Sequence, residues 1–429
     1  MKMPNGAFKQ STIRSDEYVS RETALEILSV KPQTLYAYVS RGWIRSVQQP
    51  GGGKRSLYAR VDVEKMKSRS GVRQGHQLVA ANAMRWGEPI IPTAITEITA
   101  DGPYYRGKHA ITLARSGASY ESVSEWLWSG LWLDQVAAWP VEEMPAHIAG
   151  LFDARRSGPL NEHLIWRFAL LSLHVGATRG KLIEGGWAPD APRAARQMIQ
   201  AMVGCIGTLG PSRKFNPVRP GESVSRALLR VLGAPINDAN VRAMESILIL
   251  AADHELTGST FAARVAASSG ALLHACLNAA LATHSGIEIG RLCDRAENFL
   301  MLSAKADALF QQARDKQRSG VTPPGFNHPL YPRGDPRADH LIEIAAALPN
   351  KPPRLKGVLK FLEDARTSMH LFPRAELGIA VVAMALRLPP GASAGLFTIA
   401  RTAGWVAHTL EQRTSGYMLR PRARFISKI

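Results

Sequence analysis

The sequence is poor in cysteine and in long apolar runs, and each shortage argues against a class of protein. Its three cysteines, Cys205, Cys276 and Cys293, form neither a CxxC pair nor an even-numbered framework. This argues against a disulfide-stabilised secreted domain and a cysteine zinc site, and it predicts a reducing, cytoplasmic compartment. No run of about 18 apolar residues appears, and the first ten residues hold no apolar signal segment. We therefore expect neither a membrane span nor a secretory leader.

Acidic side chains are also scarce relative to basic ones. The chain has 53 Lys and Arg against 35 Asp and Glu, which gives a net charge of +18 at pH 7. Residues 1–75 alone contain 14 basic and 6 acidic side chains, a surplus of 8. Such a surplus favours anionic partners, either nucleic acid or phosphorylated small molecules. A basic solvated surface without a partner is the alternative reading.

The first ordered segment has the signals of two short helices and a hairpin. Ser20 is a suitable N-cap for a helix with an apolar stripe ending at Leu28, and Pro32 suits the first turn of a second helix reaching Val39. The turn at residues 50–53 separates two short strand-like runs, which together predict a wing, and a closing helix follows. The glycines of this turn lack the spacing of a phosphate-binding loop.

Residues 20–44 resemble the MerR-type winged helix-turn-helix pattern. The resemblance implies that the second helix enters the major groove of DNA and that the wing follows the phosphate backbone. Basic side chains there neutralise phosphates, whereas amide and hydroxyl groups reach base edges. The candidate DNA contacts are Gln33, Thr34, Tyr36 and Arg41 on the second helix and Lys54 and Arg55 on the wing. A module used only for packing or dimerisation is the alternative.

From about Glu88 onward the apolar residues recur with helical spacing and no alternating strand pattern is found. We therefore expect an all-α body, preceded by a flexible lead (1–15), the winged helix-turn-helix (16–68) and a linker (69–90). The expected long helices are Ala239–Ala252, Thr260–Ala282, Gly290–Ala313, Pro353–Met369 and Leu377–Leu388.

Five separated motifs in this body, taken in order, resemble the citrate synthase family. They lie at residues 98–130, 247–265, 324–337, 401–405 and 419–425. The resemblance implies an all-helical homodimer with a large domain (91–290 and 393–429), a small mobile domain (291–392) and active sites shared between subunits in the cleft between domains. Domain closure in such enzymes excludes water from reactive intermediates.

The resemblance also implies a reaction, in which the acyl group of a thioester is condensed with the ketone of a 2-oxo acid such as oxaloacetate. Arginine suits the dicarboxylate because its planar fork binds carboxylates bidentately. By resemblance Arg337, Arg401 and Arg420 form this clamp, with Arg420 reaching the partner subunit's site. His254 would hold the substrate and His328 would polarise its ketone.

At two positions this chain differs from the family pattern. The family's loop Ser-Gly-Pro-Leu-His-Gly-Gly becomes 285–291, so that Ile289 stands where a histidine donates to the enolate oxygen. Loss of one such donor typically lowers the rate by about 10²–10³. The pattern Pro-Asn-x-Asp-Phe becomes 373–377, which places Glu376 at the position of the catalytic aspartate. His284, Glu288 and Arg291 are the nearby side chains considered as replacements for the missing donor.

The resemblance also implies that the acyl-CoA site is altered. Asn327 replaces a glycine near the expected position of the adenine, and Lys316 and Arg318 are candidates for the CoA phosphates or for a solvated basic helix end. We expect no metal, because Asp253, His254 and Glu255 lack the HExxH spacing, and no cofactor beyond acyl-CoA as substrate.

Two functions remain open on the sequence. The first is a citrate synthase-like C-acyltransferase with weak or altered activity. The second is an inactive relative that senses a dicarboxylate or citrate-like ligand and binds DNA through residues 16–68. A third possibility keeps the fold and uses Glu376 as the sole acid or base.

Overall fold

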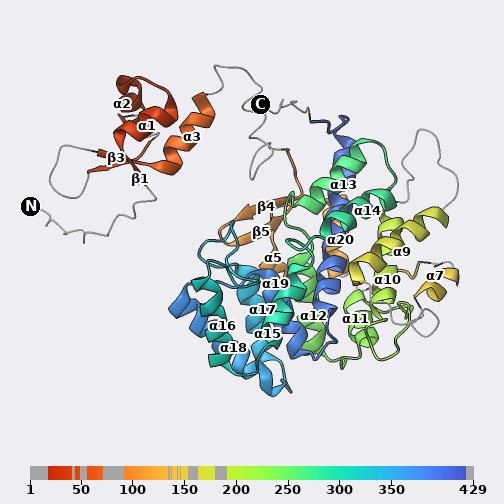
Figure 1. Cartoon of the computed structure of the whole chain (residues 1–429). Coiled ribbons are helices and arrows are strands. Elements are labelled where there is room, and N and C mark those ends of the chain that lie inside the picture. The colour runs from red at the N-terminus through yellow and green to blue at the C-terminus, as the bar shows by residue number, and fades with distance from the viewer. Residues whose placement is uncertain are drawn as a thin grey trace, which may run out of the picture. The chain divides into compact units, whose positions relative to one another are not determined.

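The structure is a computed structural model of the 429-residue chain (Figure 1). It describes residues 18–40, 44–48, 56–70, 91–133, 136, 138–142, 144, 146–152, 163–178 and 191–421. The chain divides into two compact units, of which the first contains Met1–Pro92 with Pro421–Ile429 and the second contains Thr93–Arg420.

The first unit combines short helices with a small antiparallel sheet. Its order is β1 (Tyr18–Val19), α1 (Arg21–Leu28), α2 (Pro32–Ser40), β2 (Ser46–Gln48), β3 (Ser56–Ala59) and α3 (Arg60–Ser70). The strands pair in the order β1-β3-β2. The turn expected at residues 50–53, together with Arg41, Lys54 and Arg55, lies outside the described residues.

Local sequence signals account for these elements. The Ser20 hydroxyl accepts a hydrogen bond from the backbone N–H of Thr23 at 3.1 Å, as predicted for an N-cap, and Pro32 begins α2. Leu28, Leu35 and other apolar side chains of the three helices form a separate small core. This core explains how a short segment packs as its own unit.

The second unit begins with a three-stranded sheet, which corrects the all-α prediction. The strands β4 (Thr96–Thr99), β5 (Gly102–Tyr105) and β6 (Lys108–His109) pair antiparallel in chain order. Strands of two to four residues are too short to show an alternating pattern in the sequence. The rest of the unit is mostly helical.

Helices make up most of the second unit after β6 (Figure 1). They are α5 (Ala110–Arg115), α6 (Tyr120–Ser129), α7 (Ala146–Leu151), α9 (Leu164–Thr178), α10 (Ala191–Ile206), α11 (Val224–Leu232), α12 (Asp238–Ala251), α13 (Gly258–Ser268), α14 (Leu273–His284), α15 (Leu292–Met301), α16 (Ala306–Arg318), α17 (Pro336–Ala347), α18 (Pro353–Met369), α19 (Ala375–Ala385) and α20 (Ala392–Thr414).

Two of the predicted long helices are each divided in two. The expected helix Thr260–Ala282 is α13 and α14, separated at Gly270, which has φ +83°. A left-handed residue cannot continue a right-handed helix, and glycine adopts that conformation without strain. The expected helix Gly290–Ala313 is likewise α15 and α16, with a break around Ser303.

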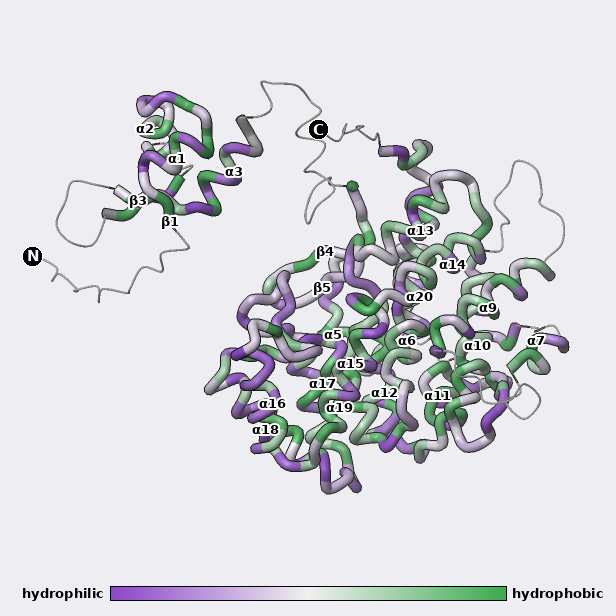
Figure 2. The backbone as a smooth tube through the Cα atoms, in the orientation of Figure 1, coloured by the Kyte–Doolittle hydropathy of each residue, from purple (hydrophilic) through white to green (hydrophobic). Residues whose placement is uncertain are grey.

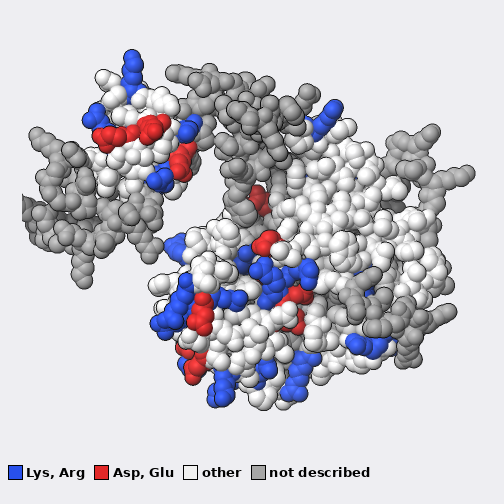
Figure 3. Space-filling model, in the orientation of Figure 1, with Lys and Arg blue, Asp and Glu red and all other residues white. Residues whose placement is uncertain are grey.

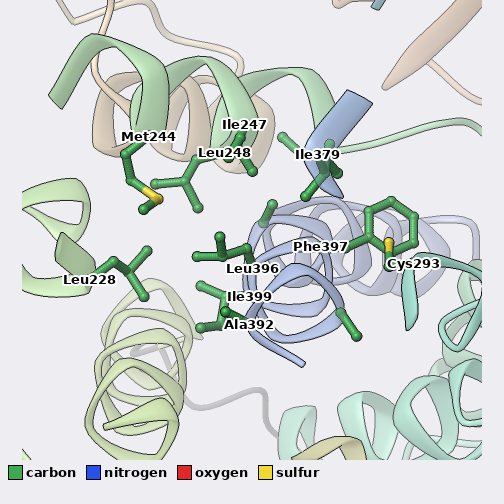
Figure 4. Packing of buried hydrophobic residues seen from close by; sticks show 14 of the residues in the cluster. Leu228, Met244, Ile247, Leu248, Cys293, Ile379, Ala392, Leu396, Phe397 and Ile399 are labelled. Atoms are coloured by element: carbon green, nitrogen blue, oxygen red, sulfur yellow. The ribbon is translucent and has the colours of Figure 1, made fainter. Parts of the chain in front are cut away.

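The long helix α20 forms the centre of the second unit. Nearly every side chain from Ala392 to Thr409 is buried. Leu396 and Ile399 extend toward Leu228 of α11 and Leu248 of α12 (Figure 4). Figure 2 shows that α12 and α19 are largely hydrophobic, whereas α16 is largely hydrophilic. The central helix thus fixes the elements that carry the site.

The predicted boundaries of a small domain fall close to element ends. Residue 291 immediately precedes α15, and residue 392 is the first residue of α20. The division of this unit into a large and a small domain stays a prediction.

Among the described helices, none combines the length and the hydropathy that a membrane crossing requires.

Candidate active site

Four elements bring the predicted histidines and arginines together. His254 follows the end of α12, His328 lies in the loop after α16, Arg337 lies in the first turn of α17 and Arg401 lies in the middle of α20. The rings of His254 and His328 are 5.2 Å apart between centroids. The hydroxyl of Tyr331 lies 3.0 Å from Nε2 of His254. Residues distant in sequence therefore form one buried cluster.

His328 is held in the form that can donate a hydrogen bond. Its Nδ1 accepts from the backbone N–H of Leu330 at 3.1 Å, so the proton of the neutral ring is on Nε2. Burial, with Arg337 and Arg374, lowers the pKa of His328 to about 4. At neutral pH the ring is therefore an uncharged donor, which is the form that can polarise a ketone oxygen.

His254 is also uncharged in this cluster. Burial is the largest cause, and the nearby Arg337 and Arg401 add to it, so that the pKa of His254 lies well below its usual value. Burial raises the pKa of Tyr331 to about 12, so the phenol keeps its proton beside His254. These neutral groups can hydrogen-bond an anionic ligand without adding charge to the cluster.

Arg337 is fixed before any ligand arrives. Its Nε and one terminal nitrogen donate to the two carboxylate oxygens of Asp335 at 3.0 and 2.8 Å. Asp335 also caps α17 and accepts from the backbone N–H of Ala375 at 3.0 Å. Burial would lower the pKa of Arg337, but Asp335 outweighs it and raises the pKa, so the guanidinium stays charged. The pair thus joins α17 to the start of α19.

Arg401 is positioned by contacts within α20 and with the end of α12. It is 3% exposed, and its Nε donates to the carbonyl oxygen of Ala251 at 2.7 Å. Its guanidinium carbon lies 4.9 Å from the centre of the Phe397 ring. Burial lowers the pKa of Arg401, and Asp253 opposes that effect. The cation is therefore buried next to His254 with a fixed orientation.

Glu376 lies in the first turn of α19 and forms an ion pair that the sequence did not reveal. Arg374 donates from its Nε and a terminal nitrogen to the two oxygens of Glu376, at 3.3 and 3.1 Å. Burial alone would raise the pKa of Glu376, but Arg374 and Arg337 outweigh it and lower the pKa to about 2. An arginine two residues before the carboxylate was the available signal for this pair.

Ile289 lies in the turn between α14 and α15 and offers no hydrogen bond. Its side chain is half-buried and faces the start of α13, where its Cδ1 is 3.4 Å from the position of a Cβ on Gly258. Glu288 is exposed and pairs with Arg295 at 3.3 Å. Arg291 is exposed at the start of α15. Neither side chain replaces the missing donor in this arrangement.

His284, the third candidate replacement, packs against aromatic side chains of α20. Its ring is fully buried, with centroids 5.3 Å from Phe397 and 5.2 Å from Trp405. Burial is the main cause that lowers the pKa of His284 to about 3, and Arg401 adds to it. The ring is neutral, and both of its nitrogens are buried without a hydrogen-bond partner among the described residues.

The candidates for CoA binding lie on α16 and on the loop that follows it. Asn327 adopts φ +56°, and its side-chain oxygen accepts from the backbone N–H of Phe372 at 2.8 Å. Asparagine tolerates this left-handed conformation better than most residues. Lys316 and Arg318 occupy the last turn of α16, in a region where basic and acidic side chains are mixed (Figure 3). Arg420 is exposed beyond the end of α20.

The described residues offer no cluster of three His, Cys, Asp or Glu side chains that could hold a metal ion. A cavity of about 510 Å³ opens beside Glu255, next to β4 and β5. It is lined by Thr93, Ala94, Ile95, Thr96, Glu97, Ile98, Tyr104, Arg106, Gly107 and Glu255. None of the predicted site residues lines this cavity.

The chain is similar to known proteins over most of its length. The family model "Citrate synthase, C-terminal domain" matches residues 84–422. Citrate synthase 2 of Bacillus subtilis is 31% identical over 249 residues, which cover 55% of this chain and 66% of that protein. Putative citrate synthase 2 of Mycobacterium bovis is 30% identical over 284 residues, covering 60% and 75%.

Solved structures show the same fold. Citrate synthase of Thermoplasma acidophilum, in a ternary complex with carboxymethyl coenzyme A and oxaloacetate, superposes with a TM-score of 0.69 at 23% identity, covering 80% of this chain and 94% of that one. The enzyme of Thermotoga maritima superposes with a TM-score of 0.66 at 21% identity, covering 81% and 96%. The cluster lies within the matched residues, and the chain belongs to the citrate synthase family.

Proposed function

We propose that this protein binds a 2-oxo dicarboxylate such as oxaloacetate in the cluster and condenses it only slowly with an acyl-CoA. The observation that carries the proposal is the preformed arrangement of Arg337 and Arg401 around two neutral histidines. Arginines that are already oriented lose little entropy when they bind a carboxylate. The relative from Thermoplasma acidophilum, named above with oxaloacetate, supports the same ligand.

Slow chemistry follows from two side chains. Ile289 cannot donate a hydrogen bond to an enolate oxygen, and loss of one such donor lowers rates by about 10²–10³. Glu376 has a pKa of about 2 and is engaged by Arg374. A general base works best when its pKa lies near the operating pH, so a carboxylate this acidic abstracts a weakly acidic proton poorly.

A thiol-release assay on the full-length protein tests the proposal. Oxaloacetate is supplied with acetyl-CoA and, separately, with propionyl-CoA, and calorimetry measures oxaloacetate binding in parallel. We expect clear oxaloacetate binding with thiol release that is slow but above the uncatalysed rate. Rapid turnover would contradict the slow chemistry, and an absence of oxaloacetate binding would contradict the proposed ligand.

A DNA-binding, ligand-sensing regulator is the second candidate. The observation that favours it is the first unit, where two short helices are followed by the antiparallel pair β2–β3 and by α3. This order is that of the winged helix-turn-helix proposed from the sequence. In this reading the cluster binds its ligand without turnover and the first unit binds DNA.

Assembly and acyl-CoA binding complete the proposal. A homodimer would let Arg420 reach the partner's cluster, as the family resemblance implies. Lys316 and Arg318 would meet the phosphates of CoA, with Asn327 near its adenine. The exposed side chains are those of Arg318, Asn327 and Arg420, whereas Lys316 is half-buried. This exposure is compatible with a ligand that lies along the surface.

A further inference from the structure

One side of α20 binds the three residues that precede His254. Positions 401, 404 and 408 are spaced by three and four residues, so they lie on the same side of the helix. Arg401 donates from its Nε to the carbonyl oxygen of Ala251 at 2.7 Å. The backbone N–H of Gly404 donates to the carbonyl oxygen of Ala252 at 3.0 Å. The third contact, at position 408, joins two side chains.

This third contact is a buried pair of His408 and Asp253. Nε2 of His408 lies 3.2 Å from Oδ2 of Asp253, and both side chains are 0% exposed. A carboxylate only accepts hydrogen bonds, so the proton between the two groups is on Nε2 of His408. Burial alone would raise the pKa of Asp253, but His408 and Arg401 outweigh it and hold that pKa below its usual value. Asp253 is therefore an ionised carboxylate that His408 ties to α20.

Asp253 in turn restricts the backbone at His254. Its Oδ2 also accepts from the backbone N–H of Glu255 at 3.1 Å, so the carboxylate closes a turn around the residue between them. The hydroxyl of Tyr105 accepts from the backbone N–H of Asp253 at 3.4 Å. His408 and the His254 backbone are thus linked through a single carboxylate.

Gly404 permits this close approach of the segment to the helix. A Cβ at this position would lie 2.2 Å from Oδ1 of Asp253 and 2.6 Å from the carbonyl oxygen of Ala252. These distances are far shorter than a normal contact, so a side chain here would displace the segment. The residues before His254 therefore pack directly on α20, with no room to shift toward it.

The His254 ring is the group whose place depends on this packing. Its Nε2 lies 3.0 Å from the hydroxyl of Tyr331, and its centroid lies 5.2 Å from that of His328. Both histidines are proposed to contact the same small ligand. A displacement of about 1 Å in such a site lowers its efficiency by about 100-fold.

We propose that His408 is a positioning residue of the ligand site, which acts through Asp253 to fix the backbone of His254. The proposal rests on the proposed function, because it takes His254 as a group that binds the 2-oxo dicarboxylate. His408 lies about two turns along α20 from Arg401, so one helix supplies both a residue that binds the ligand and one that orients its neighbour.

Calorimetric titration of the full-length protein with oxaloacetate tests the proposal. His408→Leu removes the N–H that binds Asp253, and it should weaken oxaloacetate binding by about 10- to 100-fold, the range for one hydrogen bond to a charged group. His408→Gln keeps an N–H donor in place of Nε2 and should bind within about threefold of the unmodified protein. An affinity for His408→Gln as low as that for His408→Leu would overturn the role of this N–H.

Two further variants deal with stability. Leu228→Ala opens a cavity in the core of the second unit, so it should lower the melting temperature and leave oxaloacetate affinity unchanged. His408→Leu leaves Asp253 as an unpaired buried charge, which is strongly destabilising. If that variant does not fold, His408→Leu combined with Asp253→Asn removes the charge as well as the contact, and the same loss of affinity is expected.

A double-mutant cycle with His254→Ala separates positioning from a general effect on the fold. Because His408 is proposed to act through His254, His408→Leu should change the affinity by less than about twofold once His254 is alanine. Equal losses in both backgrounds, or full affinity in His408→Leu, would overturn the proposal while oxaloacetate binding stands. No binding of oxaloacetate by the unmodified protein would overturn the proposed function and this proposal with it.

Discussion

At the scale of single residues, the site combines a buried cluster of arginines and histidines, which we propose binds an anion, with two positions that differ from the family pattern. Ile289 removes a donor, and Arg374 converts Glu376 from a free carboxylate into one half of an ion pair. These two changes act on different requirements of the condensation, namely enolate stabilisation and proton abstraction. Restoring one of them alone leaves the other limiting.

A combined variant should therefore recover activity. We expect Ile289→His, Arg374→Asn and Glu376→Asp together to raise the rate of thiol release with oxaloacetate and acetyl-CoA by about 10² or more, since one donor alone is worth about 10²–10³. The matched control is Ile287→His, which adds a histidine two residues away at a side chain that is 57% exposed. An unchanged rate, with oxaloacetate still bound, would contradict this account of the slow chemistry.

The sequence predicted those site residues that belong to motifs. Arg337 and Arg401 were found because each lies in a matching segment, and the structure places both beside His254. Tyr331 was missed because its role depends on a contact with His254, 77 positions away in the chain. Arg374 was missed because its importance comes from a pairing that only the three-dimensional arrangement displays.

At the scale of elements, the sequence predicted long helices better than their ends or the short strands. The helix Pro353–Met369 was predicted with the bounds of α18, since Pro352-Pro353 begins it and the left-handed His370 ends it. Thr260–Ala282 was wrong as one helix, because the apolar spacing continues across the break at Gly270. The sheet β4-β5-β6 was missed because its strands are stabilised by pairing, which periodicity does not record.

The hairpin of β2 and β3 carries a prediction at this scale. A wing that follows DNA places basic side chains against phosphates, and each neutralised phosphate contributes about 0.9 to the slope of log K against log salt. Replacing Lys54 and Arg55 by glutamine should therefore lower that slope by about two for duplex DNA, measured by fluorescence anisotropy. The control replaces two exposed α18 lysines, Lys356 and Lys360. Equal slopes for all three proteins would argue against a DNA-binding wing.

At the scale of the whole molecule, one helix presents an apolar face that the other described residues leave exposed. Along α9, Trp166, Leu170 and Leu173 are 50%, 45% and 56% exposed, while Phe168 and Leu171 are fully buried. Their spacing of four and three residues places the exposed side chains on one side of the helix. A contiguous exposed apolar stripe of this kind indicates a protein partner, and a second copy fits the proposed homodimer.

Charge placed on this stripe should separate the subunits. Leu170→Glu with Leu173→Glu puts two carboxylates in a face that would be buried between copies, where unpaired charges are strongly unfavourable. We expect sedimentation velocity to give the unmodified protein a mass of twice that of one chain, which is 46.7 kDa. The variant should have the mass of a single chain. Leu302→Glu, at a 60% exposed leucine next to α15, is the matched control and should stay dimeric. Because Arg420 is proposed to act in the partner's site, the separated variant should also bind oxaloacetate more weakly. A variant that remains dimeric would exclude α9 as the contact between subunits.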